Sequence, residues 1–215
     1  MGIDRPDYLE FSRKILDFFC DHYSPDYAFG KGWYFDGRCA EEKGTIGAFV
    51  TMALCEAYRI LGDERYLEYA ARSLEFYVHR DIDNFVCTAG AIDCTCVDKE
   101  TAGPVIISAL DLYEFTGDEK YIEWAVKASY YFASWMFVYD VHYGEEAEFT
   151  EYGYYTAGAT AVSVQHPALD QWGELMCSEW LRLADITGDQ RWRARARMMW
   201  YNATQLIADE DNRVV

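Results

Sequence analysis

Four residues in two short segments have side chains that could perform acid–base chemistry. Asp93 and Asp98 lie on either side of a short uncharged stretch. His166 and Asp170 are four residues apart in a second segment. Cleavage of a glycosidic bond uses two carboxyl groups, of which one is protonated and the other is ionised. A histidine can instead act as a base near neutral pH. The candidate catalytic residues are therefore Asp93, Asp98, Asp170 and His166.

Side chains that could hold a sugar occur in the same parts of the sequence. Aromatic rings stack on the apolar faces of sugars, while amide and carboxylate groups form hydrogen bonds with hydroxyls. Aromatic residues make up 17% of the chain, which is more than packing usually needs, although helix packing alone could also explain the excess. The candidate substrate-binding residues are Trp33, Asp36, Asp140, Tyr155, Gln165 and Trp172.

Several of these aspartates also have a purely structural interpretation. Asp98 directly precedes a predicted helix, where an aspartate serves as an N-cap. Asp36 precedes a glycine, which is typical of a tight turn. Asp140 follows a predicted helix, and an acid there opposes the helix dipole unless a lysine or arginine pairs with it. Asp93 has no such capping role, because other residues separate it from the helix start. Both interpretations stay open for the first three aspartates.

The segment around His166 has two interpretations as well. If Pro167 occupies the first turn of a helix, His166 lies near the N-cap and Asp170 lies one turn inside on the same face. Gln165 and Trp172 would then complete a sugar-binding cluster. Alternatively, the segment is only a capped helix start, with Trp172 in the hydrophobic core.

A repeated turn divides the chain into helical hairpins. It reads Leu61-Gly62-Asp63, Thr116-Gly117-Asp118 and Thr187-Gly188-Asp189, each time between an apolar helical run and a second run that opens with an aromatic residue. Glycine ends a helix readily because it adopts left-handed backbone angles at little cost. The aspartate that follows can cap the next helix. Since one such hairpin cannot bury its apolar face alone, the hairpins must stack on one another.

Apolar periodicity and helix breakers predict one unpaired helix and three hairpins. Short turns join the helices within a hairpin, whereas links of roughly twenty residues or more join consecutive elements. All long links should therefore lie at one end of the array, and the candidate residues fall in or beside them. Residues 160–164 are β-prone and could pair locally. The predicted helices are Pro6–His22, Thr45–Leu61 and Glu64–His79, Lys99–Phe115 and Glu119–Trp135, and Pro167–Ile186 and Gln190–Ala208.

The overall charge argues against several classes of partner. The 215 residues have a net charge of −18, whereas nucleic acids and anionic membranes attract lysine and arginine. A highly anionic polymer is disfavoured as a substrate for the same reason. No apolar run is long enough to cross a bilayer, and residues 1–6 show no apolar leader, so we expect a cytoplasmic protein.

The seven cysteines predict neither a metal site nor a disulfide framework. Their number is odd and their spacing is irregular. Cys94 and Cys96 are close together but lack the further ligands of a zinc site. We therefore expect reduced, mostly buried thiols, with no metal and no other cofactor.

The hairpins resemble those of the six-hairpin glycosidase superfamily, whose fold is the (α/α)6 toroid. The typical repeat has Thr-Gly-Asp, a charged pair and a tyrosine before an alanine-rich helix. Residues 116–121 match it closely, and residues 62–66 and 187–192 match with small changes. The resemblance covers about residues 44–208 and implies an all-α fold of tandem helical hairpins that forms part of an α/α toroid. It also implies a carbohydrate-active enzyme that acts on an oligosaccharide or glycoside, and most often a glycoside hydrolase.

The sequence departs from this family in length. A complete ring of six hairpins needs twelve helices, whereas seven are predicted here. Residues 1–215 are therefore expected to form one α/α-hairpin domain, either a part of a longer barrel or an open array. Its uncovered apolar faces would pair with a second copy or with the missing part of the barrel. Alternative functions on this scaffold are a polysaccharide lyase or sugar epimerase with His166 as the base, or a non-catalytic carbohydrate-binding or scaffold piece.

Overall fold

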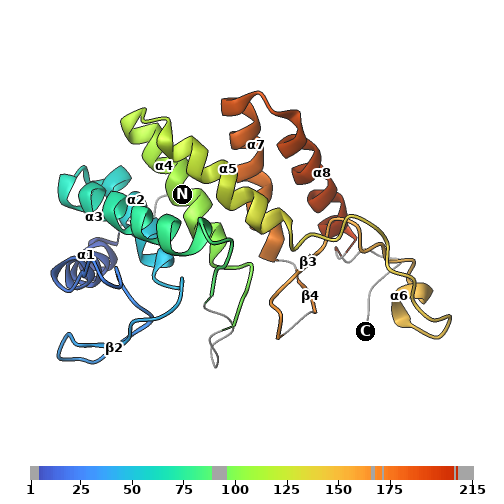
Figure 1. Ribbon diagram of the computed structural model, residues 1–215, viewed down its shortest axis with the longest axis horizontal. Coiled ribbons are helices and arrows are strands. Elements are labelled where there is room, and N and C mark those ends of the chain that lie inside the picture. Colours follow the sequence, from blue (N-terminus) through green and yellow to red (C-terminus); the bar gives the residue numbers. More distant parts are fainter. Residues whose placement is uncertain (1–4, 89–95, 166–167, 171, 206, 208–215) are drawn as a thin grey trace. The chain divides into compact units, whose positions relative to one another are not determined.

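The computed structural model describes residues 5–88, 96–165, 168–170, 172–205 and 207. The chain divides into two compact units, residues 1–131 and 132–215, and each is considered by itself (Figure 1). Helices dominate both units, and the strands found among the described residues are two or three residues long.

The first unit contains a single helix followed by two helical hairpins. Its elements are α1 (Pro6–Asp21), β1 (Gly32–Trp33), β2 (Cys39–Glu41), α2 (Ala48–Leu61), α3 (Glu64–Tyr77), the π-helix η1 (Val78–Ile82), α4 (Ala102–Thr116) and α5 (Lys120–Ala133), which runs across the boundary between the units. Strands β1 and β2 are antiparallel. In η1 the Asp83 N–H donates to the Val78 carbonyl at 2.8 Å, five residues back along the chain.

The second unit contains the last hairpin and a long link that precedes it. Its elements are α6 (Glu148–Glu151), β3 (Thr160–Ala161), β4 (Leu169–Asp170), the 3-10 helix η2 (Trp172–Leu175), α7 (Met176–Thr187) and α8 (Gln190–Thr204). Strands β3 and β4 pair in antiparallel fashion. Helices α7 and α8 pack against each other as the hairpin, and η2 contacts both.

A left-handed glycine ends the first helix of every hairpin. Gly62, Gly117 and Gly188 have φ angles of 66°, 71° and 73°, and their N–H groups donate to carbonyls four residues back. These bonds satisfy carbonyls that the end of a helix would otherwise leave without partners. The predicted turn mechanism is confirmed at all three positions.

The aspartate after each glycine caps the second helix. The carboxylates of Asp63, Asp118 and Asp189 accept the backbone N–H two residues ahead, at 3.0, 3.1 and 2.9 Å. In two of the turns a threonine adds a further bond, because Thr116 and Thr187 accept the N–H of the capping aspartate at 3.2 Å. The repeat therefore encodes both helix ends within a few residues.

An aromatic residue and an alanine four positions later form the buried stripe of each second helix. Tyr66, Tyr121 and Trp192 are all buried, and so are Ala70, Ala125 and Ala196. Residues four apart lie on the same face of a helix, and the small alanine lets the partner helix approach closely. This stripe therefore forms part of the buried apolar face of each hairpin.

The sequence predicts the helices of the hairpins well but misplaces the start of the last one. The expected helix from Pro167 is wrong, since α7 begins at Met176 and the described residues before it form β4 and η2. Thr160 explains the difference, because its hydroxyl donates to the Asp170 carbonyl at 3.1 Å and its backbone pairs with the same residue. The prediction that residues 160–164 pair locally is confirmed at residues 160 and 161, which form β3 and pair with β4.

The helices and cysteines of the described residues can be compared with membrane-spanning helices and with disulfide-bonded thiols. Among the described residues no helix is both long enough and apolar enough to span a membrane. The cysteines in the described part of the chain are all free thiols: Cys20, Cys55 and Cys87 are buried, and Cys39, Cys96 and Cys177 are half-buried. Burial raises the pKa of the Cys20 and Cys177 thiols to about 11, so these thiols are protonated at neutral pH.

We expect Gly117→Ala to lower the free energy of unfolding by about 1–2 kcal/mol, because a side chain makes left-handed backbone angles unfavourable. A Cβ at this position would meet no atom within 4 Å, so the change isolates the backbone effect. Gly144→Ala is the matched control, since its Cβ also meets nothing within 4 Å and its φ is not in the left-handed region. Urea denaturation of both variants measures the difference, and equal effects would contradict the turn mechanism.

Candidate functional site

The polar and aromatic candidates of the second unit gather at one end of the α7–α8 hairpin. Because the turn at Gly188 reverses the chain, the beginning of α7 and the end of α8 lie at the same end of the hairpin. Strands β3 and β4 and helix α6 lie at this end (Figure 1), and η2 contacts both α7 and α8 there. We call this region, residues 135–175 together with the end of α8, the loop end of the second unit.

A small three-stranded arrangement positions Asp170 in the loop end. Met136 pairs with Thr160 as an isolated bridge, and Phe137 donates its N–H to the Ala159 carbonyl at 2.9 Å. Thr160 pairs on its other side with Asp170. A Cβ on Gly173 would lie 2.7 Å from the Thr160 hydroxyl oxygen, so only glycine lets η2 pack this closely against β3.

Asp170 ends β4 and Trp172 begins η2, whereas Gln165 lies in the connection between β3 and β4. One carboxylate oxygen of Asp170 accepts the Trp172 N–H at 2.8 Å and starts η2. The Asp170 side chain is half-buried, whereas 63% of Trp172 is exposed. The predicted placement of Asp170 one helical turn after the N-cap is wrong, because Asp170 lies in a strand. Trp172 is not a core residue, so its ring is available for stacking on a ligand.

Tyr155 and Asp140 lie in the long link of the same unit. Asn202 donates to the Tyr155 carbonyl at 2.6 Å, and Gln205 accepts the Tyr155 N–H at 2.9 Å, which fixes the backbone and leaves the Tyr155 ring exposed. Asp140 is exposed and accepts the Ala157 N–H at 3.0 Å. The predicted position of Asp140 at a helix end is wrong, since α5 ends seven residues earlier. Its carboxylate instead joins two parts of the long link through the bond to Ala157.

A cluster of aromatic side chains in this unit was not predicted from the sequence. Phe149 stacks on Tyr154 with ring centres 4.9 Å apart, and Tyr143 contacts Phe149 at the same distance. The Tyr154 hydroxyl donates to the Asn202 side-chain oxygen at 3.1 Å. Burial raises the pKa of Tyr154, and the negative charge of Glu174 adds to the shift. Glu174 is therefore a second carboxylate of the loop end, four residues after Asp170.

In the first unit, Asp98 is a buried structural residue of the second long link. It is 1% exposed, and its carboxylate accepts the Thr101 hydroxyl at 2.8 Å. Its N–H donates to the Cys87 carbonyl at 3.0 Å, and its own carbonyl accepts the Tyr131 hydroxyl at 2.5 Å. These contacts favour the structural interpretation of Asp98. The helix start is displaced, however, because α4 begins at Ala102 and Asp98 bonds within the turn that precedes it.

Lys99, beside Asp98, is also completely buried. Burial lowers the pKa of its ammonium group to about 8, against the opposing effect of the Glu100 and Asp98 carboxylates. A lysine with a lowered pKa is a recognised feature of functional sites, although structural burial produces it as well. The sequence gives no signal for this burial, because lysines are nearly always exposed.

A second polar network joins two long links of the first unit. The Thr45 hydroxyl donates to Asp81 at 2.8 Å and accepts the Thr88 N–H at 2.9 Å. Arg80 donates to both Asp81 oxygens at 2.7 Å and to the Gly44 carbonyl at 2.6 Å. This cluster brings the end of link 23–43 close to link 80–98. The prediction that the long links lie at one end of the hairpins requires such a contact. Asp81 lies in η1, and π-helical turns are frequent at functional sites.

Trp33 and Asp36 lie on the β1–β2 hairpin and have structural partners. The Trp33 ring is half-buried among aromatic side chains, and its indole N–H donates to the Phe29 carbonyl at 2.7 Å. The rings that surround it belong to Phe18, Phe19, His22 and Tyr27. Asp36 is exposed in the turn, where it accepts the Arg38 N–H at 3.1 Å and pairs with its guanidinium at 2.8 Å. The contacts of Trp33 are those of a packed ring and the contacts of Asp36 are those of a turn residue.

The two remaining catalytic candidates, Asp93 and His166, lie outside the described residues, and so does Pro167. Their roles stay predictions. Within the described part of the chain, no group of three or more His, Cys, Asp or Glu side chains could hold a metal ion.

The sequence matches no protein-family model and no curated protein, but solved structures match its fold. A glycoside hydrolase family 76 α-mannanase from Bacteroides thetaiotaomicron aligns with 93% of this chain and 55% of its own, at 16% identity and a TM-score of 0.61. An unsaturated glucuronyl hydrolase aligns over 97% and 59%, at 12% identity and a TM-score of 0.60. A D-mannose isomerase aligns over 90% and 50%, at 14% identity and a TM-score of 0.52.

At identities this low, the structural alignments establish the fold alone. The chain has the all-α hairpin fold of these proteins. The expected resemblance to the six-hairpin glycosidases is thereby confirmed for the architecture. The chain spans between 50% and 59% of the length of these three structures.

We expect the stability of the native protein relative to a Lys99→Met variant to rise with pH. The Lys99 pKa is 10.5 in the unfolded chain and about 8 in the fold. Between these values the unfolded state binds the additional proton, so the free energy of unfolding increases with pH by up to about 3 kcal/mol. Below pH 8 both states are protonated, and the charged form is buried unfavourably.

The measurement is the unfolding free energy of both proteins by urea denaturation from pH 7 to 10.5. Taking the difference removes the contributions of the cysteines and tyrosines that the two proteins share. Lys14→Met, at an exposed lysine of α1, is the control. A pH-independent difference for Lys99→Met, or an equal rise for Lys14→Met, would show that burial of Lys99 is not responsible.

Proposed function

We propose that this chain is part or all of a carbohydrate-active enzyme whose reaction is glycoside hydrolysis. The observation that carries the proposal is the fold, which is shared with a family 76 α-mannanase and an unsaturated glucuronyl hydrolase over at least 93% of this chain. The loop end of the second unit supports it independently, because an exposed tryptophan lies beside half-buried carboxylates there. Stacking rings next to acids are what a glycosidase needs.

In this proposal Asp170 is a catalytic carboxylate. One of its oxygens is held by the Trp172 N–H at 2.8 Å, which fixes the orientation of the group. Glu174 and Asp93 are the candidates for the second carboxyl group. The burial of Asp98 and its bonds to Thr101 support a positioning role for Asp98.

The proposed substrate-binding residues surround Asp170 in the sequence of the second unit. Trp172 stacks on a sugar ring, and Gln165 and Tyr155 offer hydrogen bonds to hydroxyl groups. Asp140 braces the link that carries Tyr155. Trp33 and Asp36 have structural partners in the first unit, which makes them weaker candidates.

The proposed substrate is a neutral glycoside, with mannosides as the first to be tested. A net charge of −18 disfavours a highly anionic polymer. Two of the similar structures are described as an α-mannanase and a D-mannose isomerase. A sugar of the mannose type is therefore proposed, because it is neutral and because two proteins of the same fold are named for mannose-based substrates.

The likeness to a D-mannose isomerase favours one alternative. Isomerisation or epimerisation needs a base that removes a proton from carbon, and His166 is the candidate for it. His166→Ala separates the two reactions. A hydrolase that depends on carboxylates should keep part of its activity, whereas an enzyme that depends on this base should lose nearly all of it.

We expect Asp170→Asn to reduce the hydrolysis of α-mannosides by roughly 10²- to 10⁴-fold, because the amide cannot serve as an acid, base or nucleophile. The amide oxygen can still accept the Trp172 N–H, so the fold should be retained. Trp172→Ala should mainly raise KM through the loss of a stacking surface. Release of reducing sugar from mannobiose and α-mannan, with circular dichroism as the check on folding, measures both.

Glu145→Gln is the control, since Glu145 is an exposed carboxylate of the same link. Its activity should match that of the unaltered chain. An Asp170→Asn variant as active as the control would contradict the role of Asp170. Calorimetric binding of mannobiose without turnover would favour the carbohydrate-binding alternative, and the lack of both binding and turnover for every sugar would contradict the proposed function.

A further inference from the structure

Three aromatic rings of the loop end pack on one another. Phe149 of α6 lies over Tyr154 with ring centres 4.9 Å apart and an angle of 26° between the rings, which is a stacked arrangement. Tyr143 contacts the Phe149 ring from a tilted position, also at 4.9 Å. Phe149 is nevertheless 40% exposed, so these rings lie at the surface of the second unit. We call these three residues the aromatic cluster.

The Tyr143 hydroxyl is buried and has no hydrogen-bond partner among the described residues. Folded proteins pair nearly all of their buried polar groups, because a buried group without a partner loses its hydration and gains nothing in return. The Tyr154 hydroxyl shows the usual arrangement, since it donates to the Asn202 side chain at 3.1 Å. The fold by itself therefore gives no reason for the buried hydroxyl of Tyr143.

The carboxylate of Glu174 lies close to the aromatic cluster. Burial raises the pKa of Tyr154, the bond to Asn202 opposes the shift, and the nearby Tyr143 and Glu174 groups add to it. Glu174 is half-buried in η2, which packs against α8. Among the described residues, no donor forms a hydrogen bond or ion pair with its carboxylate. The cluster thus contains a hydroxyl and a carboxylate that bond neither to each other nor to their described neighbours.

A sugar meets the needs of both groups at once. Its hydroxyls accept hydrogen bonds through their oxygens and donate them through their protons, so one ring accepts from Tyr143 and donates to Glu174. The apolar face of the same ring stacks on an aromatic side chain. An anionic ligand is repelled by Glu174, and an apolar ligand leaves both polar groups without partners. The chemistry of the cluster therefore selects a neutral hydroxylated ligand.

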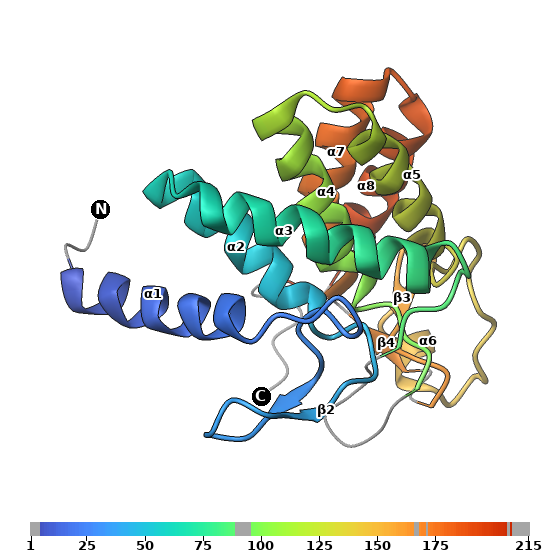
Figure 2. The ribbon, with the colours of Figure 1, turned by 60° about the vertical axis from the view of Figure 1, so that its left-hand side comes forward.

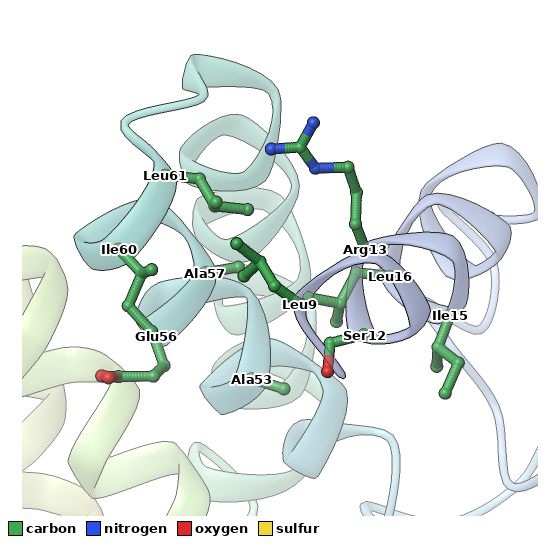
Figure 3. A pocket seen from close by; sticks show the side chains of 10 residues that line it. All are labelled: Leu9, Ser12, Arg13, Ile15, Leu16, Ala53, Glu56, Ala57, Ile60 and Leu61. Carbon is green, nitrogen blue, oxygen red and sulfur yellow. The ribbon is translucent and has the colours of Figure 1, made fainter. Parts of the chain in front are cut away.

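An apolar groove of the first unit lacks this combination of groups. It lies between α1 and α2, which are adjacent (Figure 2), and has a volume of about 370 Å³. Side chains from both helices line it (Figure 3), and no aromatic ring is among them. The one carboxylate in this lining, that of Glu56, already pairs with Arg59 at 3.3 Å. Stacking next to a carboxylate without a partner is thus a feature of the second unit.

Phe149 covers the face of Tyr154 on which a sugar would stack. Helix α6, which carries it (Figure 1), is a single turn without a buried residue. The backbone hydrogen bonds of residues 144–151 all go to residues 144–154, and Thr150 adds a local bond to the Gly144 carbonyl at 2.9 Å. A segment with so few buried contacts opens at low cost. Phe149 can therefore leave Tyr154 without breaking a backbone bond to α7 or α8.

We propose that Tyr143, Tyr154 and Glu174 form a sugar-binding subsite of the loop end, and that Phe149 covers this subsite until a sugar ring takes its place. The inference rests on the proposed function, to which it adds a second stacking surface besides Trp172. In the covered state an aromatic ring stands where the apolar face of the sugar will lie. Binding replaces that ring by the sugar and gives partners to the two polar groups.

The first test needs no ligand. Tyr143→Phe removes a hydroxyl without a partner, so its midpoint of urea unfolding should equal or exceed that of the unaltered chain. Tyr154→Phe removes a hydroxyl that is bonded to Asn202 and should lower the midpoint. An equal loss in both variants would show that the Tyr143 hydroxyl has a structural partner, and the proposal would be overturned.

The second test measures the binding of thio-linked neutral disaccharides, mannobiose first, by calorimetry, because the sulfur bridge resists hydrolysis. Tyr143→Phe should weaken binding by about 2- to 10-fold through the loss of one hydrogen bond. Phe149→Ala should tighten binding by about 2- to 10-fold, since the sugar no longer competes with a stacked ring. Tyr152→Phe is the control, at a tyrosine directly after α6 that is 62% exposed, and should bind like the unaltered chain.

The opposite signs of the two effects separate a covered subsite from a general loss of structure, which would weaken binding in both variants. Weaker binding by Phe149→Ala would show that its ring supports the site and does not cover it, and would overturn the proposal. If the unaltered chain binds a sugar and both variants match Tyr152→Phe, the subsite is wrong while the proposed function stands. An unaltered chain that neither binds nor hydrolyses any of these sugars would overturn both.

Discussion

One backbone constraint shapes every hairpin of this protein: the chain must reverse within two or three residues. A left-handed glycine meets it by turning the backbone and by bonding back to the last helical turn. An aspartate follows and starts the next helix. Because the short turn occupies one end of the hairpin, every longer segment has to leave from the other end. The position of the candidate site follows from this asymmetry.

Side chains from helix ends hold the long links in place. In the first unit, Arg80 and Asp81 of η1 bind the backbone of Gly44 directly and that of Thr88 through Thr45. In the second unit, Asn202 and Gln205, at and just after the end of α8, bind the backbone of Tyr155. These polar contacts add to the apolar packing of the links, such as that of the buried Phe29 and Ala159. A link of this length can then present a side chain in a fixed direction, which recognition of a sugar requires.

The sequence predicts what depends on neighbours along the chain and fails where distant partners decide. The glycine turns, the aspartate caps and the aromatic–alanine stripes involve residues within about five positions, and all three are confirmed. The sequence alone predicts a helix at Asp170, because its partner Thr160 is ten residues away and has no local signature. Lys99 and Asp81 look like ordinary surface charges, and only the folded chain buries them. Trp33 and Asp98 show the converse: both are residue types suited to chemistry, but Trp33 packs among aromatic rings and Asp98 bonds within a buried turn.

The turns also bear on how such a protein can change over evolutionary time. Each hairpin contains its own stop and start signals: a Cβ on Gly62, Gly117 or Gly188 would meet no other atom within 4 Å, and the aspartate that follows bonds to the backbone two residues ahead. A whole hairpin can therefore be duplicated or deleted in a single genetic event without new signals in its neighbours. Chains of different hairpin number are accessible to one another in this way.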